Sequence, residues 1–165
     1  MEHDHSDKKD NYRPLFVLLA LITLAAMAMV YGRYILRPAD FMRYFMGLFF
    51  LQFAMFKLFD LKGFADGFQM YDLLAKPFRP YAYVYPLLEL ALGLLYLSGT
   101  ALQWANIATL ALMAFSAVGV LRGIRSKMDI RCACLGTVLN VPLSTVSAVE
   151  NIGMGLMAAA MLAQL

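Results

Sequence analysis

Gln103–Leu121, with the sequence QWANIATLALMAFSAVGVL, is one continuous stretch without a charged side chain. A helix needs about 20 mostly apolar residues to cross the hydrocarbon core of a bilayer, so this stretch predicts a membrane-spanning helix. Four further stretches of similar length are also mostly apolar: Pro14–Tyr34, Phe41–Phe59, Tyr81–Ser98 and Thr145–Ala163. Together the five stretches predict an all-α membrane protein.

The composition of the whole chain supports this expectation. Of its 165 residues, 62% are hydrophobic and 15% are charged, and the mean hydropathy is +0.66. Soluble domains carry about 25% charged residues, so this chain has too few polar side chains to cover its surface in water. The net charge is +3, and the basic residues flank the apolar stretches instead of forming one face. The predicted partner is therefore a lipid bilayer, and nucleic acid is excluded.

The chain divides into a leader, an anchor and a larger membrane domain. Residues 1–13 are polar and are predicted to be disordered. Residues 14–36 are predicted to form an N-terminal transmembrane helix. Their apolar run is longer than the roughly 7–15 residues of a signal peptide, which favours an uncleaved anchor. Residues 41–165 then form a domain with the other four spans.

The segment Lys62–Lys76 differs from the spans because it is amphipathic. Its apolar residues recur at helical spacing, and they are Phe64, Phe68, Tyr71 and Leu74 or Ala75. Its polar residues fall on other faces, and they are Asp66, Gln69, Asp72 and Lys76. This pattern predicts a helix that lies in the membrane interface.

Five spans place the N-terminus, the Lys62–Pro80 segment and the Arg122–Val141 loop on one side of the membrane. That side carries these basic residues: Lys8, Lys9, Arg13, Lys62, Lys76, Arg79, Arg122, Arg125, Lys127 and Arg131. The other side carries Arg33, Arg37 and Arg43. Because cytoplasmic loops are enriched in Lys and Arg, we expect the first side to be cytoplasmic and the C-terminus to lie outside. The predicted location is the cell inner membrane, with several spans.

Both cysteines of the chain lie in that Arg122–Val141 loop, as Cys132 and Cys134. In extended backbone, residues i and i+2 lie roughly 6.5–7 Å apart, at the upper limit for a disulfide. A bridge between them would be strained and easily exchanged. The neighbouring Arg131 favours the thiolate, which attacks disulfides and binds metals. Two thiolates also suit Cu(I), mercury or another soft metal. The residues leave redox chemistry and metal binding open.

Ionisable residues inside apolar spans form a second group of candidates, because charge in a membrane usually faces a partner or a cavity. Lys57 and Glu89 lie in the second and third spans, and we expect them to form an intramembrane polar pair. Such a pair either fixes helix packing or carries protons. Glu150 lies in the span that follows the cysteines and is predicted to approach them as a proton acceptor.

The run from Arg43 to the C-terminus resembles the MauE branch of the MauE/DoxX family of redox-associated integral membrane proteins. Four motifs carry the resemblance, and they are Lys57-Leu58-Phe59-Asp60 followed by Gly63-Phe64, Pro86-Leu87-Leu88-Glu89-Leu90 followed by Gly93, Cys132-Ala133-Cys134-Leu135-Gly136, and Glu150-Asn151. The chain has Cys-Ala-Cys-Leu-Gly where family members often have Cys-Gly-Cys-Phe-Gly. The resemblance implies a DoxX-like four-helix transmembrane bundle over residues 41–165, with Pro14–Tyr34 as an added helix.

The resemblance also implies a type of function. The namesake belongs to methylamine utilisation and assists the maturation or transport of a disulfide-rich subunit, and some relatives carry a heavy-metal-binding domain. We therefore expect a thiol-redox accessory protein that uses Cys132, Cys134 and Glu150 on a thiol/disulfide partner protein. The alternatives are a soft-metal binding or transport protein that exchanges copper or mercury with a metal-binding protein, and a non-catalytic membrane scaffold. The sequence does not decide whether the protein is an enzyme.

Overall fold

The computed structural model describes residues 13–32, 34, 37–125 and 143–164. These residues form helices connected by short turns and contain no strand. The helices are α1 (Arg13–Tyr31), α2 (Pro38–Phe59), α3 (Leu61–Tyr71), α4 (Arg79–Ser98), α5 (Leu102–Arg125) and α6 (Leu143–Leu162). Within the described residues, α1, α2, α4 and α5 are long and apolar enough to cross a membrane. The all-α membrane fold predicted from the sequence is therefore confirmed.

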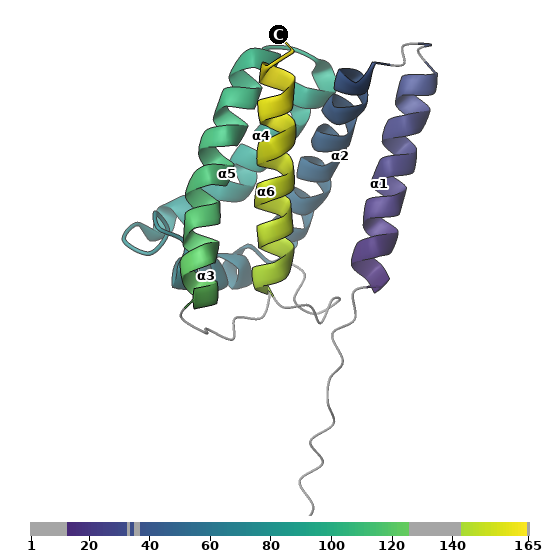
Figure 1. The fold of residues 1–165 in the computed structure, drawn as a ribbon. Coiled ribbons are helices and arrows are strands. Elements are labelled where there is room, and N and C mark those ends of the chain that lie inside the picture. The colour runs from purple at the N-terminus through teal and green to yellow at the C-terminus, as the bar shows by residue number, and fades with distance from the viewer. Residues whose placement is uncertain (1–12, 33, 35–36, 126–142, 165) are drawn as a thin grey trace, which may run out of the picture.

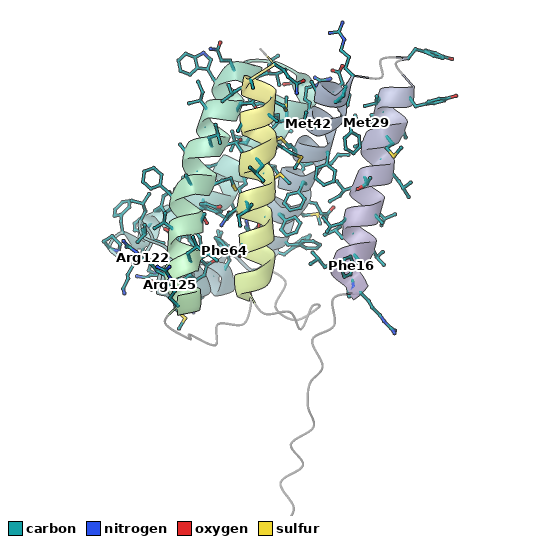
Figure 2. The ribbon with its side chains drawn as sticks, in the orientation of Figure 1. Phe16, Met29, Met42, Phe64, Arg122 and Arg125 are labelled. Atoms are coloured by element: carbon teal, nitrogen blue, oxygen red, sulfur yellow. The ribbon has the colours of Figure 1, made fainter. Side chains whose placement is uncertain are left out.

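The longer helices run side by side, and α3 lies across one end of the bundle (Figure 1). The most extensive packing joins α2 to α4 and α5 to α6, whereas α1 packs against α2 at the edge. The 20-residue α6 coincides with the fifth expected span and lies alongside α5. One face of α1 points away from the bundle, and Phe16 of α1 is 67% exposed (Figure 2).

The beginning of α1, the end of α5 and the beginning of α6 all lie at the end of the bundle that carries α3 (Figure 1). We call this end the α3 end. Arg122 and Arg125, near the end of α5, are found there (Figure 2). The end of α5 and the beginning of α6, which flank the cysteine segment in the sequence, therefore both lie at the α3 end. Cys132 and Cys134 themselves lie outside the described residues, as does the leader up to residue 12.

A close approach between α2 and α4 brings their facing side chains together. A Cβ atom added to Gly93 would lie 3.1 Å from the carbonyl oxygen of Gly47 and 3.1 Å from the backbone nitrogen of Leu51. Such contacts are tighter than ordinary van der Waals packing, so glycine at this position lets the two backbones approach. Small residues serve the same purpose in other membrane helix pairs. This approach brings the halves of α2 and α4 that carry Lys57 and Glu89 into one core.

The helix boundaries correct the expectations at three places. The second helix begins at Pro38, because proline is well suited to the first turn of a helix and does not break it there. The first helix begins at Arg13 and ends at Tyr31, short of Tyr34. The amphipathic helix ends at Tyr71, short of Lys76.

Asp72 was expected on a polar face, but it is only 2% exposed, and this prediction was wrong. Its carboxylate accepts hydrogen bonds from the backbone N–H groups of Leu74 and Ala75, at 2.9 Å each. The side chain therefore folds back onto the turn that follows α3. Burial raises the pKa of Asp72 above its ordinary value of 3.8, and the hydrogen bonds from Ala75 and Leu74 offset part of that rise.

Asp72→Asn is expected to make the free energy of unfolding less dependent on pH. Because the pKa of Asp72 is raised in the folded protein, its stabilising contribution is fully present below the ordinary pKa of 3.8. That contribution is lost as the pH rises through the higher folded pKa. Asparagine keeps an oxygen acceptor for Leu74 and Ala75 but binds no proton. Unfolding in mixed micelles at a series of acidic to neutral pH values measures the difference between the two proteins.

Asp72→Ala is the matched comparison for this experiment. It removes the acceptor for both N–H groups, so the unfolding free energy should fall by about 1 kcal/mol, the usual effect of losing such a cap. If wild type and Asp72→Asn show the same pH profile, Asp72 does not titrate with a raised pKa in the folded protein.

Candidate functional site

Three charged side chains from three helices meet in the core of the bundle. The Lys57 ammonium of α2 donates to Glu89 Oε1 of α4 at 2.5 Å and to Glu150 Oε1 of α6 at 3.4 Å. Lys57, Glu89 and Glu150 are 4%, 0% and 6% exposed. We call these three residues the charge cluster. It ties together helices that are far apart in the sequence, because residues 57 and 150 meet across 93 positions.

The helices bring these side chains together for simple reasons. Lys57 lies in the last turn of α2, where its charge interacts favourably with the helix dipole. Glu89 lies in the middle of α4, on the face that the close approach at Gly93 turns toward α2. Glu150 is near the middle of α6, two turns after that helix begins at the α3 end. A long, flexible lysine side chain can thus reach both carboxyl groups.

Aromatic rings and neutral polar groups surround the cluster. The Lys57 nitrogen lies 5.0 Å from the ring centre of Tyr85 and 5.5 Å from that of Phe64, distances suited to cation–π attraction. Figure 2 shows Phe64 at the level of the lower bundle, toward the α3 end. The Asn151 amide donates to the Ser116 hydroxyl at 3.1 Å, and Ser116 also lies within hydrogen-bonding reach of Tyr85. These groups link α4, α5 and α6 beside the cluster.

A second polar group lies farther along α4 and α5, near the turn that joins them. The Tyr96 hydroxyl makes hydrogen bonds with Asn106 Oδ1 at 2.8 Å and with Thr109 Oγ1 at 3.0 Å. All three side chains are fully buried. Because they carry no charge and hold the two ends of a helical hairpin together, we assign them a packing role.

The structure brings together some of the predicted site residues. Lys57 and Glu89 are in direct contact. Glu150 was expected near the cysteines, and among the described residues its carboxylate contacts Lys57. The positions of Cys132 and Cys134 lie outside the described residues. Within the described part of the chain, no group of three or more His, Cys, Asp or Glu side chains could hold a metal ion.

Sequence reasoning did not find several residues of the site. Tyr85, Ser116 and Phe64 contact the cluster or its neighbours, but hydroxyls and aromatic rings are common in apolar helices and give little signal by themselves. The available signal was the position of Tyr85 one turn before Glu89. Residues three or four apart lie on one face of a helix, so a buried Glu89 implies a neighbouring Tyr85.

Comparison with known proteins gives the relationship of this chain. The family model described as "Methylamine utilisation protein MauE" matches residues 35–164, which include α2 to α6 and leave out α1. A search of curated proteins and a search of solved structures gave no significant match. The matched range contains the whole charge cluster and both cysteines. Because the match covers far more than half of the chain, this multi-pass membrane protein belongs to the MauE family.

Proposed function

We propose that this protein is a thiol-redox accessory protein of the inner membrane, acting in the maturation or transport of a partner protein. Cys132 and Cys134 exchange a disulfide with the partner, and the charge cluster takes up and returns the protons. One observation carries the proposal. The helix into which the cysteine segment leads, α6, presents Glu150 to a buried lysine that already holds a second carboxyl group.

The exchange proceeds in two balanced steps. A partner thiolate attacks one sulfur of the Cys132–Cys134 disulfide, forming a mixed disulfide and releasing the other cysteine as a thiolate. The second partner thiolate then attacks the partner sulfur of the mixed disulfide, so a partner disulfide forms and the second cysteine is released. Two electrons pass to Cys132 and Cys134, and the two protons from the partner's thiols end on them. The reverse reaction carries the electrons to the partner.

Proton transfer gives Glu150 its role. A cysteine leaves a disulfide more readily when its sulfur is protonated or its charge is stabilised, and Arg131 supplies positive charge beside the pair. Glu150 is a titratable group within the helix that follows the pair, and Lys57 and Glu89 connect it to the bundle core. In this proposal the cluster exchanges protons with the sulfurs at the α3 end.

The distribution of basic residues supports an orientation for this chemistry. Arg122 and Arg125 lie at the α3 end, together with the beginning of α1 (Figure 2). Because positive charge concentrates on the cytoplasmic side, the proposal puts the α3 end and the cysteines in the cytoplasm and the C-terminus outside. The partner's thiols then meet the protein at the cytoplasmic face.

Thiol trapping in intact cells tests the chemistry and the orientation together. Cys132→Ser and Cys134→Ser each leave one cysteine that cannot resolve a mixed disulfide, so at least one variant should accumulate a covalent complex with the partner on a non-reducing gel. The double variant should lose this complex. A membrane-impermeant maleimide added before lysis should leave both cysteines unlabelled, because the chain has no other cysteine and these face the cytoplasm.

Two outcomes contradict the proposal. If neither single variant forms a mixed disulfide, thiol exchange is not the function. The cysteines would then be assigned to metal handling if the purified protein binds one Cu(I) and the double variant binds none. If the impermeant maleimide labels the cysteines in intact cells, they face the outside, and the proposed orientation is wrong.

A further inference from the structure

We propose that Glu89 and Glu150 share one bound proton in the resting protein, so that the charge cluster is a proton-binding site inside the membrane. This goes beyond the thiol exchange, because the cluster should keep its proton even when both cysteines are replaced by serine. In the exchange proposed above, this proton is the one given to a leaving thiolate.

The first argument is the balance of charge. Of the charged side chains buried in the described part of the chain, Lys57 is the one cation, and it faces two carboxyl groups. With all three groups ionised, the cluster carries one net negative charge. A charge without compensation in an apolar interior is strongly unfavourable, and a titratable group usually becomes neutral instead. One proton on the carboxyl pair brings the net charge to zero.

The second argument is geometric. Both carboxyl groups contact the same ammonium, so their two Oε1 atoms lie no more than 5.9 Å apart, the sum of the two contact distances. The other oxygen of Glu89, Oε2, is buried and has no hydrogen-bond partner among the described residues when both acids are ionised. Buried polar atoms nearly always have a partner. The Glu150 carboxyl lies within hydrogen-bonding reach of the Glu89 carboxyl, so one proton can be shared between the two groups.

Among the described residues, the groups with a stated contact or electrostatic interaction at the cluster do not replace that proton. From α4 these groups are the phenols of Tyr85 and Tyr81, from α3 the ring of Phe64, and from α5 and α6 the side chains of Ser116 and Asn151. All are neutral, and the Asn151 amide donates to Ser116. Asp72, which follows α3, lies within electrostatic reach of Tyr81 and carries no positive charge that could replace the proton.

The sequence permits a sharp test, since the chain contains only three glutamates, Glu2, Glu89 and Glu150. Protein labelled with carbon-13 in the glutamate side-chain carboxyl groups is placed in lipid nanodiscs in the Cys132→Ser/Cys134→Ser background. Glu2→Gln removes the glutamate outside the cluster. Infrared spectra at neutral pH should then show an isotope-shifted band of a protonated carboxylic acid. The intensity of this band should correspond to one protonated carboxyl group among the two remaining glutamates. Glu89→Gln and Glu150→Gln should each abolish this band, because Lys57 then faces one carboxylate.

The spectrum of the Glu2→Gln protein that keeps Glu89 and Glu150 decides the proposal by itself, even if Glu89→Gln or Glu150→Gln does not fold. Absence of a protonated glutamate band at neutral pH contradicts the proposal, and so does a band that persists in both variants. A band that disappears when sodium replaces choline as the buffer cation also contradicts it, since the cluster would then bind a metal cation in place of the proton. If the infrared band is present but the thiol-trapping experiment in cells gives no mixed disulfide, the proposed thiol-redox function is refuted and the proton-binding site stands.

Discussion

Replacing Lys57 by methionine is expected to lower the free energy of unfolding by about 3–5 kcal/mol, the range found when one partner of a buried ion pair is removed. Methionine preserves much of the length of the side chain but leaves Glu89 and Glu150, which are 0% and 6% exposed, without the ammonium that both contact. Unfolding of the protein by sodium dodecyl sulfate in mixed micelles, followed by circular dichroism, measures the loss. The deficit should shrink at acidic pH, because protonation removes the unpaired negative charge.

Two further variants show whether the loss comes from charge. Lys57→Met/Glu89→Leu removes one positive and one negative charge together, so it should recover most of the lost stability. Arg79→Met breaks the ion pair with Asp66 at the start of α4, where the side chains are 48% and 51% exposed, and such surface pairs contribute about 0–1 kcal/mol. If Lys57→Met loses no more than Arg79→Met, the cluster contributes no more than a surface ion pair.

The sequence was sufficient to predict the helices because a membrane imposes a minimum apolar length. Gln103–Leu121 and Tyr81–Ser98 were predicted to within a few residues of α5 and α4. The boundaries were less predictable where a residue has two meanings. Pro38 disrupts a helix interior but suits a first turn, and only the surrounding chain decides between them. Asp72 looked like a surface residue because its type is usually exposed, yet it is buried as the acceptor for its own turn.

The site was predictable in part for a similar reason. An ionised side chain in an apolar stretch needs a partner, and this requirement alone pointed from Lys57 to Glu89. The same reasoning could not choose the neighbours of Glu150, since the order of spans does not determine which face of α6 packs against which helix. In the structure α6 contacts both α2 and α5, and Glu150 faces the lysine. The contact between Glu150 and Lys57 therefore became known only from the packing of α6 in the structure.

The second large effect is expected for Glu150→Gln, which should slow disulfide exchange by about 10²-fold if Glu150 transfers a proton to the leaving sulfur, the usual lower range for such catalysis. Reduced protein in lipid nanodiscs is mixed with glutathione disulfide, and samples are quenched with acid and alkylated at timed intervals. Oxidation forms the Cys132–Cys134 disulfide and releases two glutathione thiols, so the reaction needs no other oxidant. Asp66→Asn is the matched control, because it removes an exposed carboxylate of α3 and should leave the rate unchanged.

An aromatic disulfide distinguishes proton transfer from a purely structural role of Glu150. Aromatic thiolates leave without being protonated because their thiols are stronger acids, whereas an alkyl thiolate such as that of glutathione leaves faster when a proton is supplied. Glu150→Gln should therefore react with the aromatic disulfide at the wild-type rate while reacting slowly with glutathione disulfide. Equal slowing with both reagents would mean that the variant distorts the cysteine segment. An unchanged rate with both would remove Glu150 from the chemistry and leave it, with Lys57, as part of the packing of α2 against α6.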